Sequence, residues 1–177
     1  MNIFRPCFRP ESFDVVISNG VLHHTSDPKE GLRILATLTR KRGYLVIGLY
    51  HRFGRLMTDL RRLIFQYYST RLTFLDRRLN SLNETQRRAW FLDQYRNPHE
   101  SKHTIKEVCG WLEEFDLVFG RSIPGNYFGS LTDSGTSLFK KNRVGSAYES
   151  TLVELSFAFR RSQIQEGGFF VVIAQKK

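Results

Sequence analysis

The sequence has few cysteines and no long apolar run. Only Cys7 and Cys109 occur in 177 residues, far below the density of a disulfide scaffold. No apolar run approaches the roughly 20 residues that span a bilayer, and the chain shows no basic and apolar leader. We therefore expect a reduced, cytoplasmic protein without a membrane partner. No set of Cys, His, Asp and Glu has the spacing of metal ligands, so we predict no metal site.

Acidic residues are scarce in one part of the chain. The formal net charge is +10, and residues 52–96 carry ten basic and four acidic side chains, with all the basic ones arginine. Such a segment could attract a polyanion or an acidic partner, but a solvated helical face is the slightly favoured interpretation. The length suits one domain, which we place over residues 1–177.

The first fifty residues have the pattern of a βαβ unit. Residues 13–19, FDVVISN, form a short apolar run typical of a strand buried on both faces of a parallel sheet. Asp27 is a suitable helix N-cap, and Glu30 completes a capping box. We predict that the helix stops at the basic turn and glycine of residues 41–43, before a second buried strand over 43–50. The two strands should be parallel.

Residues 54–98 differ in character and are predicted to form an inserted helical cap. Helical patterns cover about 57–68 and 84–95, and their aromatic residues and leucines favour core packing. The rest of the chain should form a helix over 104–115, a strand over 115–123, a loop over 125–144, a helix over 147–160 and a final apolar strand over 167–175. The helix over 147–160 should pack by a stripe of Leu152, Leu155 and Phe159.

Polar residues and a glycine follow the first two predicted strands. Ligands of open parallel sheets lie beyond the carboxyl ends of strands, where Asn19 and Gly20 follow the first strand and Tyr50 and His51 the second. Asn19 offers both a donor and an acceptor, and Gly20 permits close backbone approach. These residues therefore predict the edge of a pocket without identifying its ligand.

Several stretches together resemble class I S-adenosylmethionine-dependent methyltransferases, especially a bacterial subgroup with an arginine-rich helical insertion. They are FDVVISNGVLHHTSDP, RGYLVIGLYHRFGR, TDLRRLIF, WFLDQYRNPHESKHT and EGGFFVVI, and they extend over nearly the whole chain. The resemblance implies an α/β fold, namely the C-terminal part of a Rossmann-like methyltransferase sheet. Three strands of the parallel type and a final antiparallel strand are expected, with the helical insertion between them.

The resemblance also implies roles for residues near the first strand. Asn19 and Gly20 should line the methionine end of S-adenosylmethionine, and Val21 and Leu22 should lie near the transferring methyl group. His24 is the candidate catalytic base, needed only where the acceptor arrives protonated. The candidates for substrate binding are His23, Tyr50 and His51.

One part of the family pattern has no counterpart here. The family begins with a strand that ends in a glycine-rich turn and a second strand that ends in an acidic residue, both of which hold the cofactor. Only 12 residues precede Phe13, and no glycine precedes Gly20. We therefore expect a truncated methyltransferase that is inactive as a lone chain. The free edge of its first strand should promote self-association.

Two other hypotheses remain open. A non-enzymatic module would use the arginine-rich insertion to bind RNA or an acidic partner, and its binding would weaken steeply with salt. Alternatively, a partner chain would supply the absent strands to a methyltransferase-like subunit. The methyl acceptor is not indicated by the sequence.

Overall fold

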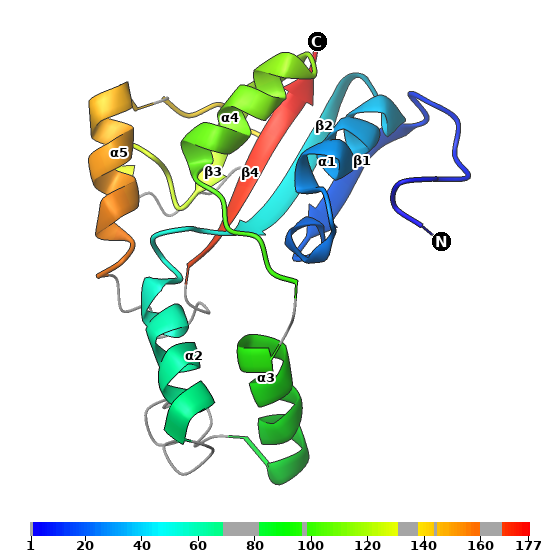
Figure 1. Ribbon diagram of the computed structural model, residues 1–177. Helices are drawn as coiled ribbons and strands as arrows, with labels where there is room; N and C mark the ends of the chain where they lie inside the picture. The colour runs from blue at the N-terminus through cyan, green and yellow to red at the C-terminus, as the bar shows by residue number, and fades with distance from the viewer. Residues whose placement is uncertain (1, 69–81, 97–98, 131–137, 144, 160–167) are drawn as a thin grey trace.

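The computed structural model describes residues 2–68, 82–96, 99–130, 138–143, 145–159 and 168–177 (Figure 1). Nine longer elements and one short 3-10 helix, Leu22–His24, occur in this part of the chain. In chain order the longer elements are β1 (Phe13–Asn19), α1 (Pro28–Leu38), β2 (Thr39–Tyr50), α2 (Leu56–Tyr68), α3 (Glu84–Arg96), α4 (Ile105–Glu114), β3 (Leu117–Ile123), α5 (Ala147–Ser156) and β4 (Phe169–Lys176). The predicted order of strands and helices is confirmed.

The four strands form one sheet in the order β1-β2-β4-β3. β1 and β2 are parallel, with Val16 paired to Leu45. β4 lies between β2 and β3 and is antiparallel to both. The predicted parallel pair and the final antiparallel strand are therefore confirmed.

Helices α1 and α4 cover one face of the sheet (Figure 1). Aliphatic residues of both helices pack with the inward side chains of β2 and β4, and residues such as Leu32, Leu45 and Leu112 are completely buried. On the opposite face, a groove of about 270 Å³ lies along the strands. Its apolar lining comes from Val15, Ile17, Val46, Ile123, Leu138, Phe139, Val171 and Ile173, with Asn19 at the end of β1.

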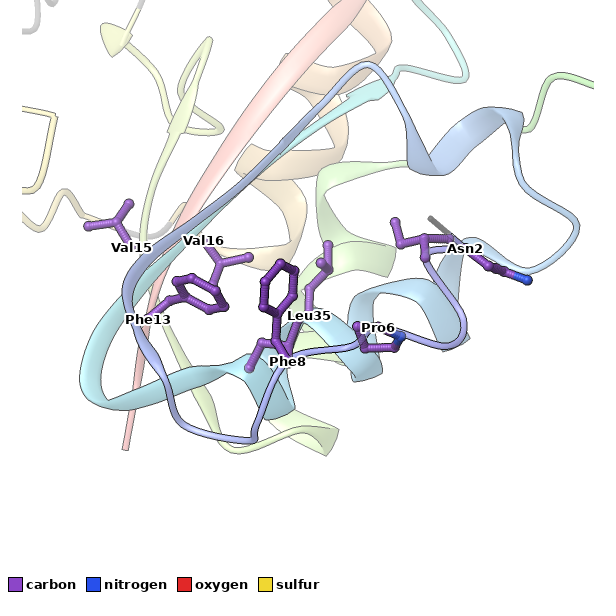
Figure 2. Close-up of a pocket in the computed structure, with 9 residues that line it drawn as sticks. Asn2, Pro6, Phe8, Phe13, Val15, Val16 and Leu35 are labelled. Atoms are coloured by element: carbon purple, nitrogen blue, oxygen red, sulfur yellow. The ribbon is translucent and has the colours of Figure 1, made fainter.

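β1 lies at the edge of the sheet, and the prediction that it is buried on both faces was wrong. Val16 is buried, whereas Val15 is 41% exposed and Ile17 67% exposed. The N-terminal segment passes close to the start of β1 and leaves a pocket of about 310 Å³ beside it (Figure 2). Phe8 and Phe13 meet edge to face there, with ring centroids 5.1 Å apart. Apolar character alone therefore does not distinguish an edge strand from a central one.

The start of α1 is as predicted, but its end is not. The Asp27 carboxylate accepts a hydrogen bond from the Glu30 amide (2.9 Å), whereas the Glu30 carboxylate pairs with Arg33 (2.6 Å) and does not return to the cap. The helix ends at Leu38, and residues 41–43 belong to β2. Tight space explains Gly43, because a Cβ atom there would lie 2.9 Å from the carbonyl oxygen of Asp14 on β1.

The middle segment forms two helices that pack against each other (Figure 1). The rings of Phe65 and Phe91 are 5.6 Å apart, which agrees with the predicted core role of these aromatics. The leucines near them do not follow that prediction, because Leu60, Leu63 and Leu92 are about half exposed. Five aromatic residues and four arginines of this segment lie outside the described residues or side chains: Tyr67, Tyr68, Phe74, Trp90, Tyr95, Arg71, Arg77, Arg78 and Arg96.

Helix α5 packs by the face opposite to the predicted one. The predicted stripe of Leu152, Leu155 and Phe159 is exposed, while Glu149 and Glu154 are buried. The Glu154 carboxylate accepts hydrogen bonds from the amides of Ile105 (3.0 Å) and Lys106 (3.2 Å) at the start of α4. These helix-terminal amides have no partner within their own helix, so a buried carboxylate satisfies them. The predicted capping box of Thr104 and Glu107 is confirmed.

A membrane-spanning helix is not found in the described part of the chain, where every helix is too short or too polar.

Candidate functional site

The end of β1 turns sharply beside β2. Gly20 has a φ of +75°, a left-handed conformation that favours glycine, and its amide donates a hydrogen bond to the Gly48 carbonyl (3.2 Å). A Cβ atom at Gly48 would collide with the Asn19 side-chain oxygen and the Phe169 ring. Asn19 therefore lies over β2 because position 48 carries no side chain.

The residues predicted to bind the cofactor separate into two groups. Asn19 and Val21 are exposed, and no neighbouring atom lies within 4 Å of the space that a Cβ would occupy at Gly20. Leu22, by contrast, is completely buried and packs against Gly31 of α1. The 19–21 turn thus presents a polar, backbone-rich surface beyond the strand, while the side chain of Leu22 belongs to the core.

His23, His24 and Tyr50 are brought together in one stack. The His23 ring centroid lies 4.0 Å from that of Tyr50 and 4.2 Å from that of His24. Phe169 meets Tyr50 nearly perpendicularly at 5.9 Å. The short helix Leu22–His24 therefore places the histidine pair against the end of β2, as expected for residues that follow neighbouring parallel strands.

The buried ring of His23 is held in its neutral form. His23 is 1% exposed, and its pKa is lowered to about 3, chiefly by burial and further by the charges of His24, Arg55 and His103. The backbone of Gly48 acts to raise the pKa. Neither ring nitrogen of His23 makes a well-formed hydrogen bond. A group that resists protonation to this degree is a poor proton acceptor.

His24 is better placed than His23 to receive a proton. Its ring is only half-buried, and its Nδ1 lies 3.1 Å from the carbonyl oxygen of His99. A carbonyl only accepts hydrogen bonds, so Nδ1 carries the proton and Nε2 is the basic nitrogen of the neutral ring. The amide of Ser101 donates to the His23 carbonyl (2.9 Å), which ties the histidine pair to the 99–103 segment.

His51 does not join this stack. Its Nδ1 accepts a hydrogen bond from the Gly54 amide (3.2 Å), so its Nε2 donates to the Glu154 carboxylate (3.0 Å). Side chains alternate across a strand, which directs His51 toward α5 and Tyr50 toward the histidine pair. Nδ1 of His51 therefore fixes the turn after β2, and Nε2 holds the carboxylate of α5 that also caps α4.

A buried ionic cluster centred on Glu100 adjoins the stack and was not predicted. The Arg55 guanidinium, completely buried, donates to both Glu100 oxygens at 2.9 Å and lies 4.0 Å from the centre of the Tyr50 ring. Arg62 also contacts Glu100 (3.0 Å), and Lys102 pairs with Asp59. We call these five residues the Glu100 cluster. A glutamate in a polar loop, distant in sequence from α2, gave no local signal of this role.

Comparison with known proteins identifies the architecture. Residues 1–47 match the family model described as methyltransferase domain. A SAM-dependent methyltransferase structure from Methanosarcina mazei aligns with 99% of this chain and 65% of its own, with a TM-score of 0.51 and 13% identity. The chain has part of the Rossmann-like fold of a methyltransferase.

A second solved structure gives a higher similarity. PKMT2 from Rickettsia typhi aligns with 100% of this chain and 38% of its own, with a TM-score of 0.64 and 16% identity. The chain thus spans less than two thirds of the length of either structure. At these identities the likeness concerns the fold.

Proposed function

We propose that this chain is the acceptor-side part of a cytoplasmic S-adenosylmethionine-dependent methyltransferase, of the subgroup with an arginine-rich helical cap. The observation that carries the proposal is the methyltransferase topology of the sheet, which brings the 19–21 turn and the histidine pair to the carboxyl ends of β1 and β2. The family match over residues 1–47 includes both features.

The residues present fit one wall of a cofactor site. Gly20 leaves open space above its backbone, and Asn19 presents an amide group beside it. In this proposal the 19–21 turn holds the methionine end of S-adenosylmethionine, which when bound supplies an activated methyl group. The other wall comes from further strands that pair with the free edge of β1, either from a longer chain or from a partner. Without them the chain is inactive.

Orientation is the main contribution of the chain's own residues. Methyl transfer is an in-line displacement, so holding the acceptor atom opposite the methyl group supplies much of the acceleration. The closely packed rings of Tyr50 and His23 form a wall beside the turn, and the lowered pKa of His23 keeps its ring uncharged. His24 accepts the acceptor's proton through Nε2 where the acceptor arrives protonated.

Titration with S-adenosylmethionine by calorimetry tests the proposal in two forms of the protein. The 177-residue chain should show no micromolar binding. The chain extended with the sequence encoded directly upstream should bind, and Gly20→Val should abolish that binding because valine disfavours a φ of +75°. Gly110→Ala is the matched control, since Gly110 is exposed and a Cβ added there would have no neighbouring atom within 4 Å. Failure of both forms to bind would refute the proposal.

The RNA-binding alternative receives little support from the described arginines. Arg55 and Arg62 face inward and pair with Glu100. Arg87 and Arg88 on α3 are exposed and keep that interpretation open.

A further inference from the structure

Helix α2 exposes a row of large apolar side chains. The side that packs inward carries Thr58 and Phe65, both buried, and Arg62, which pairs with Glu100. A second apolar side faces outward. We call that side the α2 stripe; it consists of Leu56, Met57, Leu60 and Leu63, which are 49–55% exposed.

The α2 stripe is continuous along the helix. At 100° per residue its four members fall within an arc of about 120°. Three of them follow the i, i+4, i+7 spacing that aligns side chains along one face. Leu92 of α3 is also half exposed, at 46%. Large aliphatic side chains grouped in this way mark a contact surface, unlike apolar residues scattered singly.

The charge around the stripe decides between the partners that would cover it. Among the described arginines of the cap, Arg87 and Arg88 are exposed on α3, the helix that packs against α2, and the chain as a whole has a net charge of +10. A second copy of the chain would bring the same positive segment against the first, and such like-charge contact is unfavourable. An RNA backbone would suit the exposed Arg87 and Arg88 but would gain nothing from leucines, since single strands bind by stacking on aromatic rings.

An anionic bilayer surface satisfies both features of the segment at once. Interfacial helices bury an apolar face at the boundary of headgroups and acyl chains, and basic residues around them attract anionic lipids. We propose that α2 lies on the surface of an anionic membrane, with the α2 stripe inserted among the acyl chains. The 13 residues of α2 extend about 20 Å, which suits a helix lying in the plane of the surface. This contact needs no spanning segment, so it departs from the expectation of no membrane partner, which rested on the absence of a long apolar run.

Co-sedimentation of the 177-residue chain with vesicles tests this proposal independently of methyl transfer. We expect binding to vesicles of phosphatidylcholine and phosphatidylglycerol at a 1:1 ratio, and much weaker binding to phosphatidylcholine alone. Leu60→Glu and Leu63→Glu should each lower the partition constant by about tenfold or more, because a charge replaces a leucine side chain that would otherwise be buried. Salt at 0.5 M should weaken the binding in part.

Ile17→Glu is the matched control, because Ile17 is an exposed aliphatic residue on a different surface; it should leave vesicle binding unchanged. Circular dichroism of each variant verifies that the fold is retained. Three results would overturn the proposal: no binding to the anionic vesicles, binding that is indifferent to Leu60→Glu, or equal loss in the Ile17→Glu control. A dimer in light scattering that Leu60→Glu converts to monomer would instead assign the stripe to a second copy.

Discussion

Replacing Glu100 by alanine should destabilise the protein strongly. The side chains of Glu100 and Arg55 are 2% and 0% exposed, so the variant leaves a buried guanidinium without its carboxylate. Breaking a buried ion pair by removing one partner costs about 3–5 kcal/mol. The Tyr50 ring remains 4.0 Å from the guanidinium carbon and offsets part of that cost. We therefore expect the lower value, a loss of about 3 kcal/mol in the free energy of unfolding, and a fall in Tm of roughly 6–12 °C.

Urea unfolding followed by circular dichroism measures this loss. Glu114→Ala is the control, because Glu114 pairs with Lys29 on the surface, where both side chains are about half exposed. That variant should lose less than about 1 kcal/mol. Removing both buried charges, with Arg55→Met and Glu100→Leu, should recover part of the stability that Glu100→Ala loses. Equal and small losses for Glu100→Ala and Glu114→Ala would refute the assignment of a buried ionic cluster.

Three further predictions concern the buried residues near the sheet. Burial above all lowers the pKa of His23 to about 3. The contribution of the neutral His23 ring to stability is therefore complete above pH 6.5 and is lost as the pH falls toward 3. His23→Phe should reduce the difference in urea midpoint between pH 7 and pH 5, and the same difference in the variant as in the native protein would contradict this pKa. Gly48→Ala should lower the free energy of unfolding by about 1–3 kcal/mol through overpacking, whereas Gly110→Ala, with no contacts within 4 Å, should not. Glu154→Gln leaves one acceptor oxygen for several buried donors, so it should lower the free energy of unfolding, followed by a thermal melt, by about 1–3 kcal/mol. Glu113→Gln, at an exposed position, should change it little.

Local signals in the sequence predicted the order of elements and several helix starts. Asp27 and Thr104 cap their helices as expected, because a capping side chain bonds to amides two or three residues away. The end of α1 was misplaced because the basic residues and the glycine near position 43 also suit a strand that begins at a tight crossing. The pairing of His23, His24 and Tyr50 followed from the parallel arrangement of β1 and β2.

Which face of a strand or helix is buried depends on partners that are remote in sequence. β1 has the composition of a strand buried on both faces, yet Ile17 is exposed because it points into the groove on the face of the sheet opposite α1 and α4. Likewise, a leucine stripe on α5 indicates an amphipathic helix without showing which face lies inward. The inward face carries Val153, which joins the hydrophobic core, and Glu154, which satisfies the amides at the start of α4.

Helices α2 and α5 both meet the same stretch of chain, residues 99–106. Glu100 in this stretch pairs with Arg62 of α2, and the amides of Ile105 and Lys106 donate to Glu154 of α5. A buried charge or an unpaired helix-terminal amide costs more than an exposed leucine loses, so these polar contacts act together with the buried Phe65 and Val153 in setting which face of each helix is inward. The same stretch holds His24 through the His99 carbonyl. The orientation of α2 and the placement of the candidate base therefore depend on one segment, and a change at Glu100 should disturb both.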